Sequence, residues 1–318
     1  MNTETFEVEI EYEGERLDKY LSIIFDAASS ERKLTPQSRS FFQKLIKDGL
    51  VTVNSVVQKA NYRLKEDDMV SIQIPDAVET PVVAENIPLD ILYEDDDLLV
   101  VNKPKGMVVH PSAGHYSGTL VNAVMFHCKD SLSGINGEIR PGIVHRIDMD
   151  TTGSLIVCKN DESHICIAEQ IKEHSCSRRY RGIVCGRVKE DEGTLNAPIG
   201  RHPAERKKMA VNEKNGKPAI THFKVLERFA RYTYMEFRLE TGRTHQIRVH
   251  MAGIGHPLLG DTLYSNGKSP YRLQGQTLHA MTIGFIHPKT KEYIEVSAPL
   301  PEYFEKILYD LRQIDMEK

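Results

Sequence analysis

The chain has 318 residues, of which 40% are hydrophobic and 27% are charged, and its formal net charge at pH 7 is -4. This composition is typical of a globular protein with one large domain or two smaller ones. No run of 18 apolar residues occurs and the acidic N-terminus lacks an apolar segment, so we expect neither a membrane span nor a signal peptide.

The five cysteines are odd in number, and no two of them are spaced as C-x-x-C. Free thiols in a reducing cytoplasm are the simplest interpretation, so we expect a cytoplasmic protein. A zinc site that combines cysteines with His164 and His174 would need ligand spacings that fit no known pattern, and we therefore expect no metal.

Charge is distributed unevenly along the chain. Residues 172–217 carry 12 Lys or Arg and 6 Asp or Glu, a net charge of +6, whereas residues 79–97 carry seven acids and no Lys or Arg. A basic segment of this kind can bind phosphates even when the total charge is negative. The alternative is a set of ordinary solvated faces, and charge alone does not decide between the two.

Residues 1–76 are expected to form a small α/β unit. Its elements, in chain order, are a strand over 6–12, helices over 14–25 and 37–50, a hairpin over 50–58 and a strand over 67–74. In the second helix Ser38 is the expected N-cap and Gly49 the expected C-terminal stop. The hairpin turn is expected at Asn54 and Ser55.

The second of these helices has one basic and one apolar face. The apolar side is formed by Phe41, Phe42, Leu45 and Ile46. The opposite side carries Arg39, Lys44 and Lys47, and such a face can lie on the backbone of an RNA. The alternative is an ordinary amphipathic surface helix.

Residues 77–87 contain a proline and show no clear period, so we expect a linker before a second domain over 88–318. The elements expected there are buried strands in 96–111 and 153–159, a basic strand at 177–184, an alternating strand over 232–240, a helix within 241–255 and a closing helix in 301–313. In the helix within 241–255, Thr244 is the expected cap and Gly253 the expected stop. Strands outnumber helices without a βαβ rhythm, which favours a mixed α+β domain.

Several chemistries lack their sequence motifs. The chain has no G-x-x-x-x-G-K-[ST] loop, no G-x-G-x-x-G after a strand, no H-E-x-x-H and no G-x-S-x-G. His245 and His250 are five residues apart, which does not place them on one helix face for a metal. A P-loop, a dinucleotide fold, a zinc protease and a serine hydrolase therefore have no support.

The segment GIVHRIDMDTTGSLIVCKN places Asp148 between a basic pair and a glycine turn, with an apolar run directly after. A carboxylate that acts as nucleophile or base needs a cation that stabilises and orients it. Arg146 in the same loop, or Arg243 and Arg248 in GRTHQIR, can supply that cation. Tyr180 in SRRYRGIV can stack on a base or relay a proton.

Each of these residues has a structural alternative. Asp148 can be a turn aspartate that caps the corner at 151–153. Tyr180 can be a half-buried strand tyrosine, and Arg248 can be an ordinary surface arginine.

These segments resemble the RluA family of RNA pseudouridine synthases. The stretch VHRIDMDTTGSLIVCK is similar to the family motif H-R-L-D-x-x-T-S-G, which contains its essential aspartate. Further matching blocks follow in the family's order: LLVVNKPKGMVVHP, RRYRGIV, APIGRHPAERKKMAV, GRTHQIRVHMAGIGHPLLGD and LHA…FIHP. The resemblance covers about residues 89–301, and RLDKYLS…SRSFFQKLIKDGLVTVN resembles the alpha-L type RNA-binding domain of some members. HPSAGHYSGTLVNAV and SGINGEIRPGIVHR look most like the branch of the family called ribosomal large subunit synthase D.

The resemblance implies a pseudouridine synthase fold with a mainly antiparallel sheet, and it implies roles for single residues. Asp148 would be the catalytic aspartate, and Arg248 would pair with its carboxylate. Arg146 would enter the RNA stack where the target base flips out, and Tyr180 would lie against the flipped uracil. Other residues of these blocks that we expect to bind substrate are Lys103, His145, Arg243, His245 and Gln246.

The implied function is the isomerisation of uridines to pseudouridine in structured RNA, most of all in large-subunit ribosomal RNA. The residues expected to contact RNA phosphates are Arg39, Lys44, Lys47, Arg178, Arg179, Arg201, Arg206, Lys207 and Lys208. No cofactor is needed because no net oxidation occurs, and we expect a monomer that acts on RNA and not on a membrane. The alternatives are a tRNA synthase of the same family and a non-catalytic RNA-binding protein of ribosome assembly.

The chain departs from the family pattern in a few places. Ile147 replaces a leucine, Thr152 a serine and Ser154 a leucine. The hydroxyl of Ser154 is expected to loosen the strand after the Asp148 loop. The stretch SSERKLTPQSRS is longer than the usual entry to the second helix.

Overall fold

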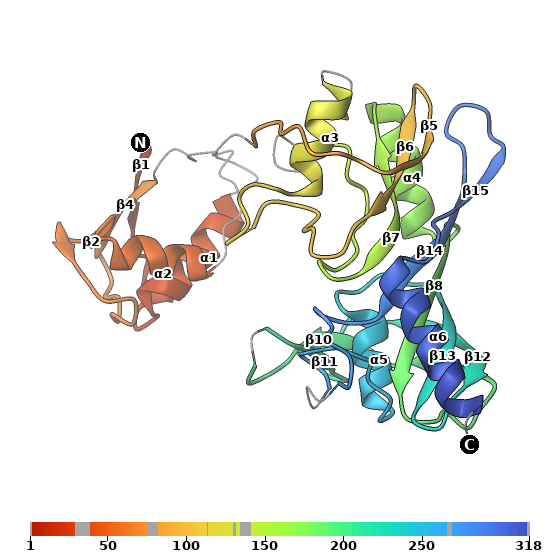
Figure 1. Ribbon diagram of the computed structural model, residues 1–318. Coiled ribbons are helices and arrows are strands. Elements are labelled where there is room, and N and C mark those ends of the chain that lie inside the picture. Colours follow the sequence, from red (N-terminus) through yellow and green to blue (C-terminus); the bar gives the residue numbers. More distant parts are fainter. Residues whose placement is uncertain are drawn as a thin grey trace. The chain divides into compact units, whose positions relative to one another are not determined.

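The computed structural model describes residues 2–28, 39–74, 82–112, 114–129, 132–133, 141–205, 207–265 and 269–316. The chain divides into two compact units, Met1–Thr80 and Pro81–Lys318 (Figure 1). Within the described ranges, no helix combines the length and the apolar character needed to cross a bilayer.

The N-terminal unit is a four-stranded sheet with the order β1-β4-β2-β3 and two helices. Its elements are β1 (Asn2–Glu7), a 3-10 turn (Ile10–Tyr12), α1 (Leu17–Ala28), α2 (Arg39–Lys47), β2 (Val51–Val53), β3 (Val56–Val57) and β4 (Met69–Ile74). The strand predicted over 6–12 is therefore wrong in position. Its partner β4 begins at Met69, which pairs with Glu7, so no strand remains for the residues after Glu7 to pair with.

Two local predictions in this unit are confirmed. Gly49 has a φ of +76°, its N–H bonds to the carbonyl of Ile46, and Leu50 N–H bonds to Leu45 O at 2.9 Å, which is the Schellman arrangement. Asn54 and Ser55 both have positive φ, as a two-residue hairpin turn between β2 and β3 requires. The predicted cap Ser38 and most of the extended helix entry lie outside the described residues.

The second unit is built on a nine-stranded sheet with the order β5-β6-β7-β14-β8-β13-β12-β9, and β15 also pairs with β14. Its strands are β5 (Ile91–Glu94), β6 (Leu98–Lys103), β7 (Thr152–Cys158), β8 (Ser177–Cys185), β9 (Glu192–Asn196), β12 (Ile220–Arg228), β13 (Tyr232–Leu239), β14 (Leu278–Ile286) and β15 (Tyr293–Ser297). Every pair is antiparallel except β7 with β14, which confirms the mixed, mainly antiparallel α+β class.

Helices cover the sheet, and β10 (Ile199–Arg201) and β11 (Met209–Val211) form a separate hairpin. The helices are α3 (Leu120–Cys128), α4 (Asp161–Lys172), α5 (Gln246–Gly253) and α6 (Glu302–Met316). The apolar runs in β6 and β7 are buried on both faces of the sheet. Leu99 and Leu155 join the cluster that contains α3 residues, whereas Leu98 and Ile156 join the cluster that contains Ile167 of α4.

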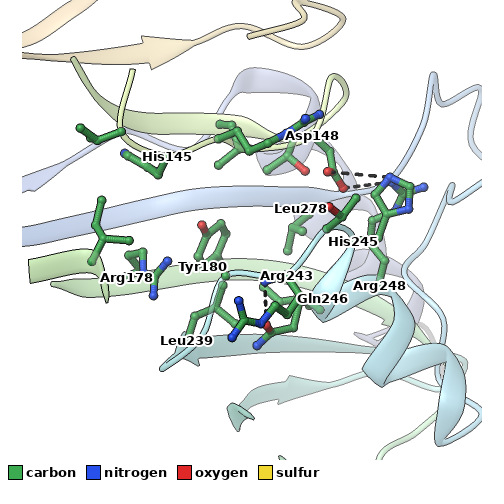
Figure 2. A pocket seen from close by; sticks show the side chains of 18 of the residues that line it. His145, Asp148, Arg178, Tyr180, Leu239, Arg243, His245, Gln246, Arg248 and Leu278 are labelled. Carbon is green, nitrogen blue, oxygen red and sulfur yellow. Dashed lines mark hydrogen bonds and ion pairs between the residues drawn. The ribbon is translucent and has the colours of Figure 1, made fainter. Parts of the chain in front are cut away.

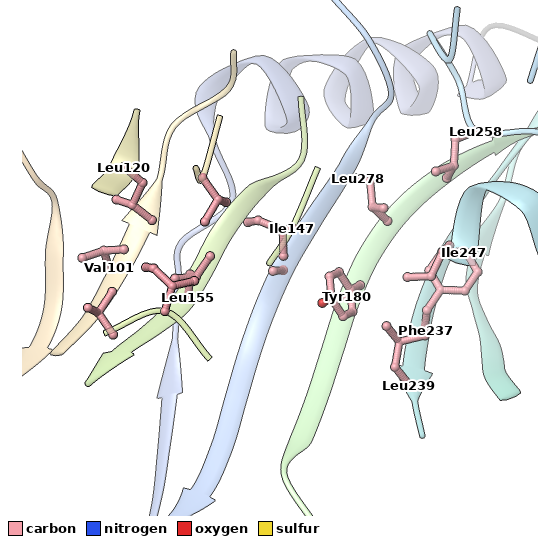
Figure 3. Packing of buried hydrophobic residues seen from close by; sticks show 14 of the residues in the cluster. Val101, Leu120, Ile147, Leu155, Tyr180, Phe237, Leu239, Ile247, Leu258 and Leu278 are labelled. Atoms are coloured by element: carbon pink, nitrogen blue, oxygen red, sulfur yellow. The ribbon is translucent and has the colours of Figure 1, made fainter. Parts of the chain in front are cut away.

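The largest core cluster extends across the sheet from β6 to β13 (Figure 3). The alternating strand predicted over 232–240 is confirmed as β13, and its alternate residues Met235, Phe237 and Leu239 are all buried. On α6 a stripe that includes Phe304 and Leu308 packs against Ile183 of β8 in a separate cluster. In the largest cluster, residues from the strands also meet residues from α5.

Residues 82–87, predicted as part of a linker, are bonded to the second unit. Val83 accepts a hydrogen bond from the side chain of Asn122 at 2.7 Å, and the carboxylate of Glu85 accepts from Gly118 N–H at 3.1 Å. This stretch therefore lies against the start of α3.

The predicted ends of α5 need correction. His245, and not Thr244, precedes the first helical residue, and it makes no side-chain cap bond. Gly253 is the last helical residue, and Gly255 takes the positive φ of +83° that ends the turn. Each observed end of α5 lies within two residues of the predicted one.

Candidate active site

A cavity of about 450 Å³ opens at the rim of the main core, beside the loop that carries Asp148 (Figure 2). Its floor is apolar: Ile147, Tyr180, Leu239 and Leu278 line the cavity and also belong to the core cluster. Its polar lining comes from the same loop, from the C-terminal end of α4, from β8 and from the segment that enters α5. The cavity is therefore a slot with an apolar floor and charged groups at its edge.

The Asp148 loop is fixed by a bond within the loop and by contacts with β14 and the residues just before it. Thr151 N–H bonds to the Asp148 carbonyl at 3.0 Å, and the Thr151 hydroxyl accepts from Gln276. Gly153 has a φ of +109°, and a Cβ there would lie 2.2 Å from the Ala280 carbonyl oxygen. The glycine of the T-T-G turn is therefore required by the close approach of β14.

The Asp148 carboxylate points into the cavity and not at the corner of the turn. Its Oδ2 accepts from Arg248 Nη1 at 3.0 Å, and its side chain is 17% exposed. The turn is thus capped by the main-chain carbonyl of Asp148, and not by its side chain as the alternative from the sequence proposed.

Arg248 is buried on α5 and is 5% exposed, so it is not an ordinary surface arginine. Its Nε and Nη2 donate to the two oxygens of Asp261 at 2.7 and 3.0 Å, and Nη1 donates to Asp148. Burial alone would lower the pKa of this guanidinium, but the bonds to Asp261 and the charge of Asp148 outweigh it and raise the pKa. A permanently charged, fixed guanidinium therefore orients the Asp148 carboxylate.

Tyr180 on β8 lies in the floor of the cavity and is 7% exposed. Burial raises the pKa of its phenol, and the charge of Arg178 partly opposes this shift. Tyr180 is thus both a packed strand tyrosine and a residue that lines the cavity, so the structural and the functional interpretation of the sequence both apply.

Arg178 and His145 line one end of the cavity, on the far side of Tyr180 from Asp148 in Figure 2. The Nε2 atom of His145 accepts from Ile156 N–H at 3.0 Å, and burial, with a smaller effect of Arg178, lowers the pKa of this imidazole to about 3. Arg178 is 5% exposed and donates to the Glu240 carbonyl at 2.9 Å, while its Nε has no hydrogen-bond partner among the residues that the structure describes. Arg178 thus differs from the expected surface phosphate contact, because its guanidinium is buried against the cavity.

Arg146, Arg243, His245 and Gln246 also line the cavity, as predicted for substrate-binding residues. Arg146 is exposed at its edge. Arg243 donates from Nε to Pro218 O, which directs its side chain along the neighbouring backbone. Whether these side chains contact the substrate stays a prediction.

Lys103 differs from the expectation for a substrate-binding residue. It is fully buried, does not line the cavity, and donates from Nζ to the carbonyls of Pro104, Met107 and Met149 at 2.8 to 2.9 Å. Burial lowers the pKa of this ammonium group to about 7. Its three bonds instead join the turn after β6 to the Asp148 loop.

The hydroxyl of Ser154 does not loosen β7 in the way the sequence predicts. It is 2% exposed and donates to Ala280 O at 3.0 Å, so it links β7 to β14.

The remaining basic residues divide by their surroundings. Exposed positions are Lys44, Lys47, Arg179, Arg201 and Lys207. Arg39 is 45% exposed but forms two hydrogen bonds with the buried Asp18 of α1, and Lys208 pairs with Glu205. Arg206 lies outside the described residues.

Two residues of the site have no role assigned from the sequence. Asp261 is fully buried and binds Arg248. The ring of Tyr264 lies 5.1 Å from the Arg248 guanidinium, and the Tyr264 hydroxyl forms a hydrogen bond with Nδ1 of His245. Asp261 stands at the end of the block GRTHQIRVHMAGIGHPLLGD, directly after a glycine, and this position is the feature of the sequence that could have indicated a role in the site. Tyr264 had none.

One group in the described part of the chain places three potential metal ligands together: Asp95, Asp97 and His287. Both ring nitrogens of His287 are already bonded, Nε2 to Asp95 and Nδ1 to the backbone N–H groups of Lys289 and Thr290. The group is thus occupied by internal bonds, and it lies outside the cavity lining.

Comparison with known proteins identifies the chain's relatives. Residues 97–253 match the family described as RNA pseudouridylate synthase, and residues 32–70 match the S4 domain. The chain is 50% identical over 303 residues to "Uncharacterized RNA pseudouridine synthase YlyB" of Bacillus subtilis (strain 168), which covers 95% of this chain and 96% of that protein. It is 42% identical over 312 residues to "Ribosomal large subunit pseudouridine synthase D" of Zymomonas mobilis, with 95% of each covered.

A solved structure gives the same result. "Human RNA Pseudouridylate Synthase Domain Containing 1" has a TM-score of 0.55 and 25% sequence identity, and the match covers 76% of this chain and 98% of that one. The likeness in sequence extends over nearly the whole chain and includes the segments that build the cavity. The chain therefore belongs to the RluA family of RNA pseudouridine synthases, enzymes that isomerise uridine in RNA.

Proposed function

We propose that this enzyme converts uridines of large-subunit ribosomal RNA to pseudouridine, with Asp148 as the catalytic carboxylate. The observation that carries the proposal is the Asp148 carboxylate, held 3.0 Å from Arg248 at the edge of a cavity of about 450 Å³ with Tyr180 in its floor. The substrate class rests on relatives named ribosomal large subunit pseudouridine synthase D.

The reaction breaks the bond between uracil N1 and ribose C1′ and forms a bond between C5 and C1′. The proton on C5 leaves, and N1 gains a proton. Atoms and electrons balance without an oxidant or a reductant, so the reaction needs no redox cofactor. The protein has to hold the detached uracil in place while it rotates, and to move one proton.

A slot of this kind suits a detached base. The apolar floor of Ile147, Leu239 and Leu278 excludes water, and Tyr180 provides an aromatic surface for the base. Asp148 lies at the edge with its direction fixed, where it can add to the sugar or the base or accept a proton. Preorganisation by Arg248 means that the carboxylate does not have to reorient during the reaction.

The target base in folded RNA has to leave its stack, at a cost of a few kcal/mol. Arg146, exposed at the cavity edge, is proposed to occupy the gap that the base leaves. Exposed basic residues such as Lys207 and Arg179 are proposed to contact phosphates, and this part of the affinity should fall steeply with salt.

We also propose a cytoplasmic monomer that works on RNA and not on a membrane. Five free cysteines fit a reducing compartment. Light scattering after size exclusion, with and without RNA, tests the monomer.

The substrate class is tested by tritium release. Large-subunit ribosomal RNA and bulk tRNA, each transcribed with tritium at C5 of uridine, are incubated separately with the enzyme. Release at a few sites in ribosomal RNA alone supports the proposal. Release from tRNA alone would make the chain a tRNA synthase, and binding of both without release would make it a non-catalytic RNA-binding protein.

A further inference from the structure

His245 has a backbone conformation that is uncommon for a residue with a side chain. Its φ is 57° and its ψ is 23°, in the left-handed region, and it precedes the first residue of α5. Such a conformation is strained for a residue with a Cβ atom and persists only where the surroundings fix it. It places the imidazole at the cavity edge, beside Asp148.

Gln246 supplies that fixation. Its Oε1 accepts from the Thr241 hydroxyl and from Arg243 N–H, and its Nε2 donates to Ile220 O and the Thr221 hydroxyl. All four bonds of this buried amide are used, so the turn from 241 to 246 has one conformation. Gln246 thus acts on the site through the backbone of His245.

Tyr264 fixes the ring of His245. The Tyr264 oxygen accepts from Met209 N–H at 2.8 Å and lies 2.8 Å from Nδ1 of His245. In the described chain no other acceptor for the phenolic proton lies within hydrogen-bonding distance, so the hydroxyl donates to Nδ1. Burial lowers the pKa of His245, which favours the neutral ring, and its single proton is then on Nε2.

Nε2 of His245 lies beside the carboxylate oxygen of Asp148 that Arg248 does not bind. Nε2 lies 3.9 Å from Oδ1, which is too far for a direct hydrogen bond. Oδ2 is bonded to Arg248, whereas Oδ1 has no donor within bonding distance among the residues that the structure describes. An oxygen atom about 2.8 Å from both Nε2 and Oδ1 would lie to one side of the line that joins them and would bridge the two groups.

Among the groups of a bound RNA nucleotide, hydrogen-bonding capacity decides which one can bridge these two atoms. The atom between Nε2–H and a carboxylate oxygen has to accept one hydrogen bond and donate another. The carbonyls of uracil and the phosphate oxygens only accept, and N3–H only donates. A hydroxyl does both, and the only free hydroxyl of an internal RNA nucleotide is the ribose 2′-hydroxyl.

We infer that the 2′-hydroxyl of the target uridine binds between His245 Nε2 and Asp148 Oδ1, and that Tyr264 is a positioning residue for His245. This contact anchors the ribose while the base rotates, and it makes the site selective for RNA over DNA. The inference rests on the proposed function, because it requires a uridine bound at Asp148.

The test is a cycle of two changes, one in the enzyme and one in the RNA. The RNA is a fragment on which the wild-type enzyme already releases tritium, and its partner carries 2′-deoxyuridine at the target only. Removing a 2′-hydroxyl also alters the reactivity of the sugar, so the loss in wild type alone is not informative. The informative quantity is how this loss in kcat/KM changes when His245 is replaced.

The enzymes are wild type, His245→Leu, His245→Gln and Tyr264→Phe. Leucine has no donor, whereas the glutamine amide places an N–H near the position of Nε2, and both replacements carry the same backbone strain. We expect the ribo-to-deoxy ratio to be about five- to tenfold larger in wild type than in His245→Leu, because one hydrogen bond is lost. His245→Gln should recover part of the ratio, and Tyr264→Phe should lower it although the imidazole remains.

Equal ratios in wild type, His245→Leu and Tyr264→Phe would overturn the inference, because a water molecule or a structural role would not couple to the 2′-hydroxyl. An RNA with a 2′-deoxy group on the nucleotide next to the target is the matched control and should show no coupling. Since the wild-type enzyme is active on the chosen RNA, equal ratios would leave the proposed function standing.

Discussion

Replacing Asp261 by Asn isolates the contribution of the cation that holds Asp148. Asp261 is fully buried, and both of its oxygens accept from Arg248. Its Oδ1 also accepts from the N–H groups of Leu263 and Tyr264 at 2.9 and 3.1 Å. Asparagine keeps the shape and one oxygen, but its amide nitrogen faces Arg248 Nε, where two donors oppose each other.

The expected loss follows from burial. The Arg248 side chain is 6% exposed, so the variant leaves a buried guanidinium with Asp148 as its one remaining carboxylate partner. Removing one partner of a buried ion pair costs about 3 to 5 kcal/mol of folding free energy. A displaced guanidinium also misdirects Asp148, so turnover should fall by roughly tenfold to a hundredfold.

Urea unfolding followed by circular dichroism measures the first effect, because the chain contains no tryptophan. The matched control is Glu227→Gln, which weakens the paired hydrogen bonds of Arg312 to Glu227 where the two side chains are 49% and 35% exposed. That surface pair should contribute at most about 1 kcal/mol. If both variants lost the same free energy, the buried pair would not be what holds Arg248.

Three further predictions concern separate parts of the chain. The Asp18 carboxyl is desolvated, but the hydrogen bonds from its arginine and glutamine partners outweigh this effect and lower its pKa to about 2. Asp18 should therefore contribute roughly 2 to 3 kcal/mol to the free energy of unfolding above pH 4, and this contribution should be lost as the pH falls toward 2. Asp18→Asn should remove this pH dependence in urea unfolding titrations, and an unchanged pH profile would contradict the prediction. Gly153→Ala should lower the free energy of unfolding by several kcal/mol and abolish turnover, because its Cβ would meet a backbone oxygen. Gly255→Ala, at a φ of +83° with open space around it, should lower it by only about 1 kcal/mol in the same urea titrations. Equal losses would refute the close-approach argument. Replacing the exposed Lys207 by Gln should weaken RNA binding and reduce the slope of log affinity against log salt by about 1, and an unchanged slope would remove it from the phosphate contacts.

Local rules recover some of the fold from sequence. The apolar runs of β6 and β7 are correctly predicted as buried strands because both faces of these strands are buried. The helix end at Gly49 and the hairpin turn at Asn54 are correctly predicted because a positive φ limits the residue types. The strand over 6–12 is misplaced because alternation continues past the point where the partner strand begins. Sheet order depends on contacts far apart in the chain, such as β14 between β7 and β8, and no local pattern gives it.

The site shows the same division. The chemistry of a carboxylate and a cation singles out Asp148 but leaves Arg146, Arg243 and Arg248 open as its partner, and only the family resemblance implies Arg248. Lys103 is misread because a lysine is rarely fully buried, and only the fold reveals the three carbonyls that enclose it. Tyr264 is missed because a tyrosine outside any motif carries no signal until its partners are known.

The most direct test of the account compares wild type with Asp148→Asn on one RNA. Tritium release from C5-labelled large-subunit ribosomal RNA and binding of the same RNA are measured side by side. We expect the variant to bind with near-normal affinity and to release no tritium, because the amide keeps the shape of the side chain but not its charge. Normal release by Asp148→Asn would contradict the central claim that this carboxylate performs the reaction.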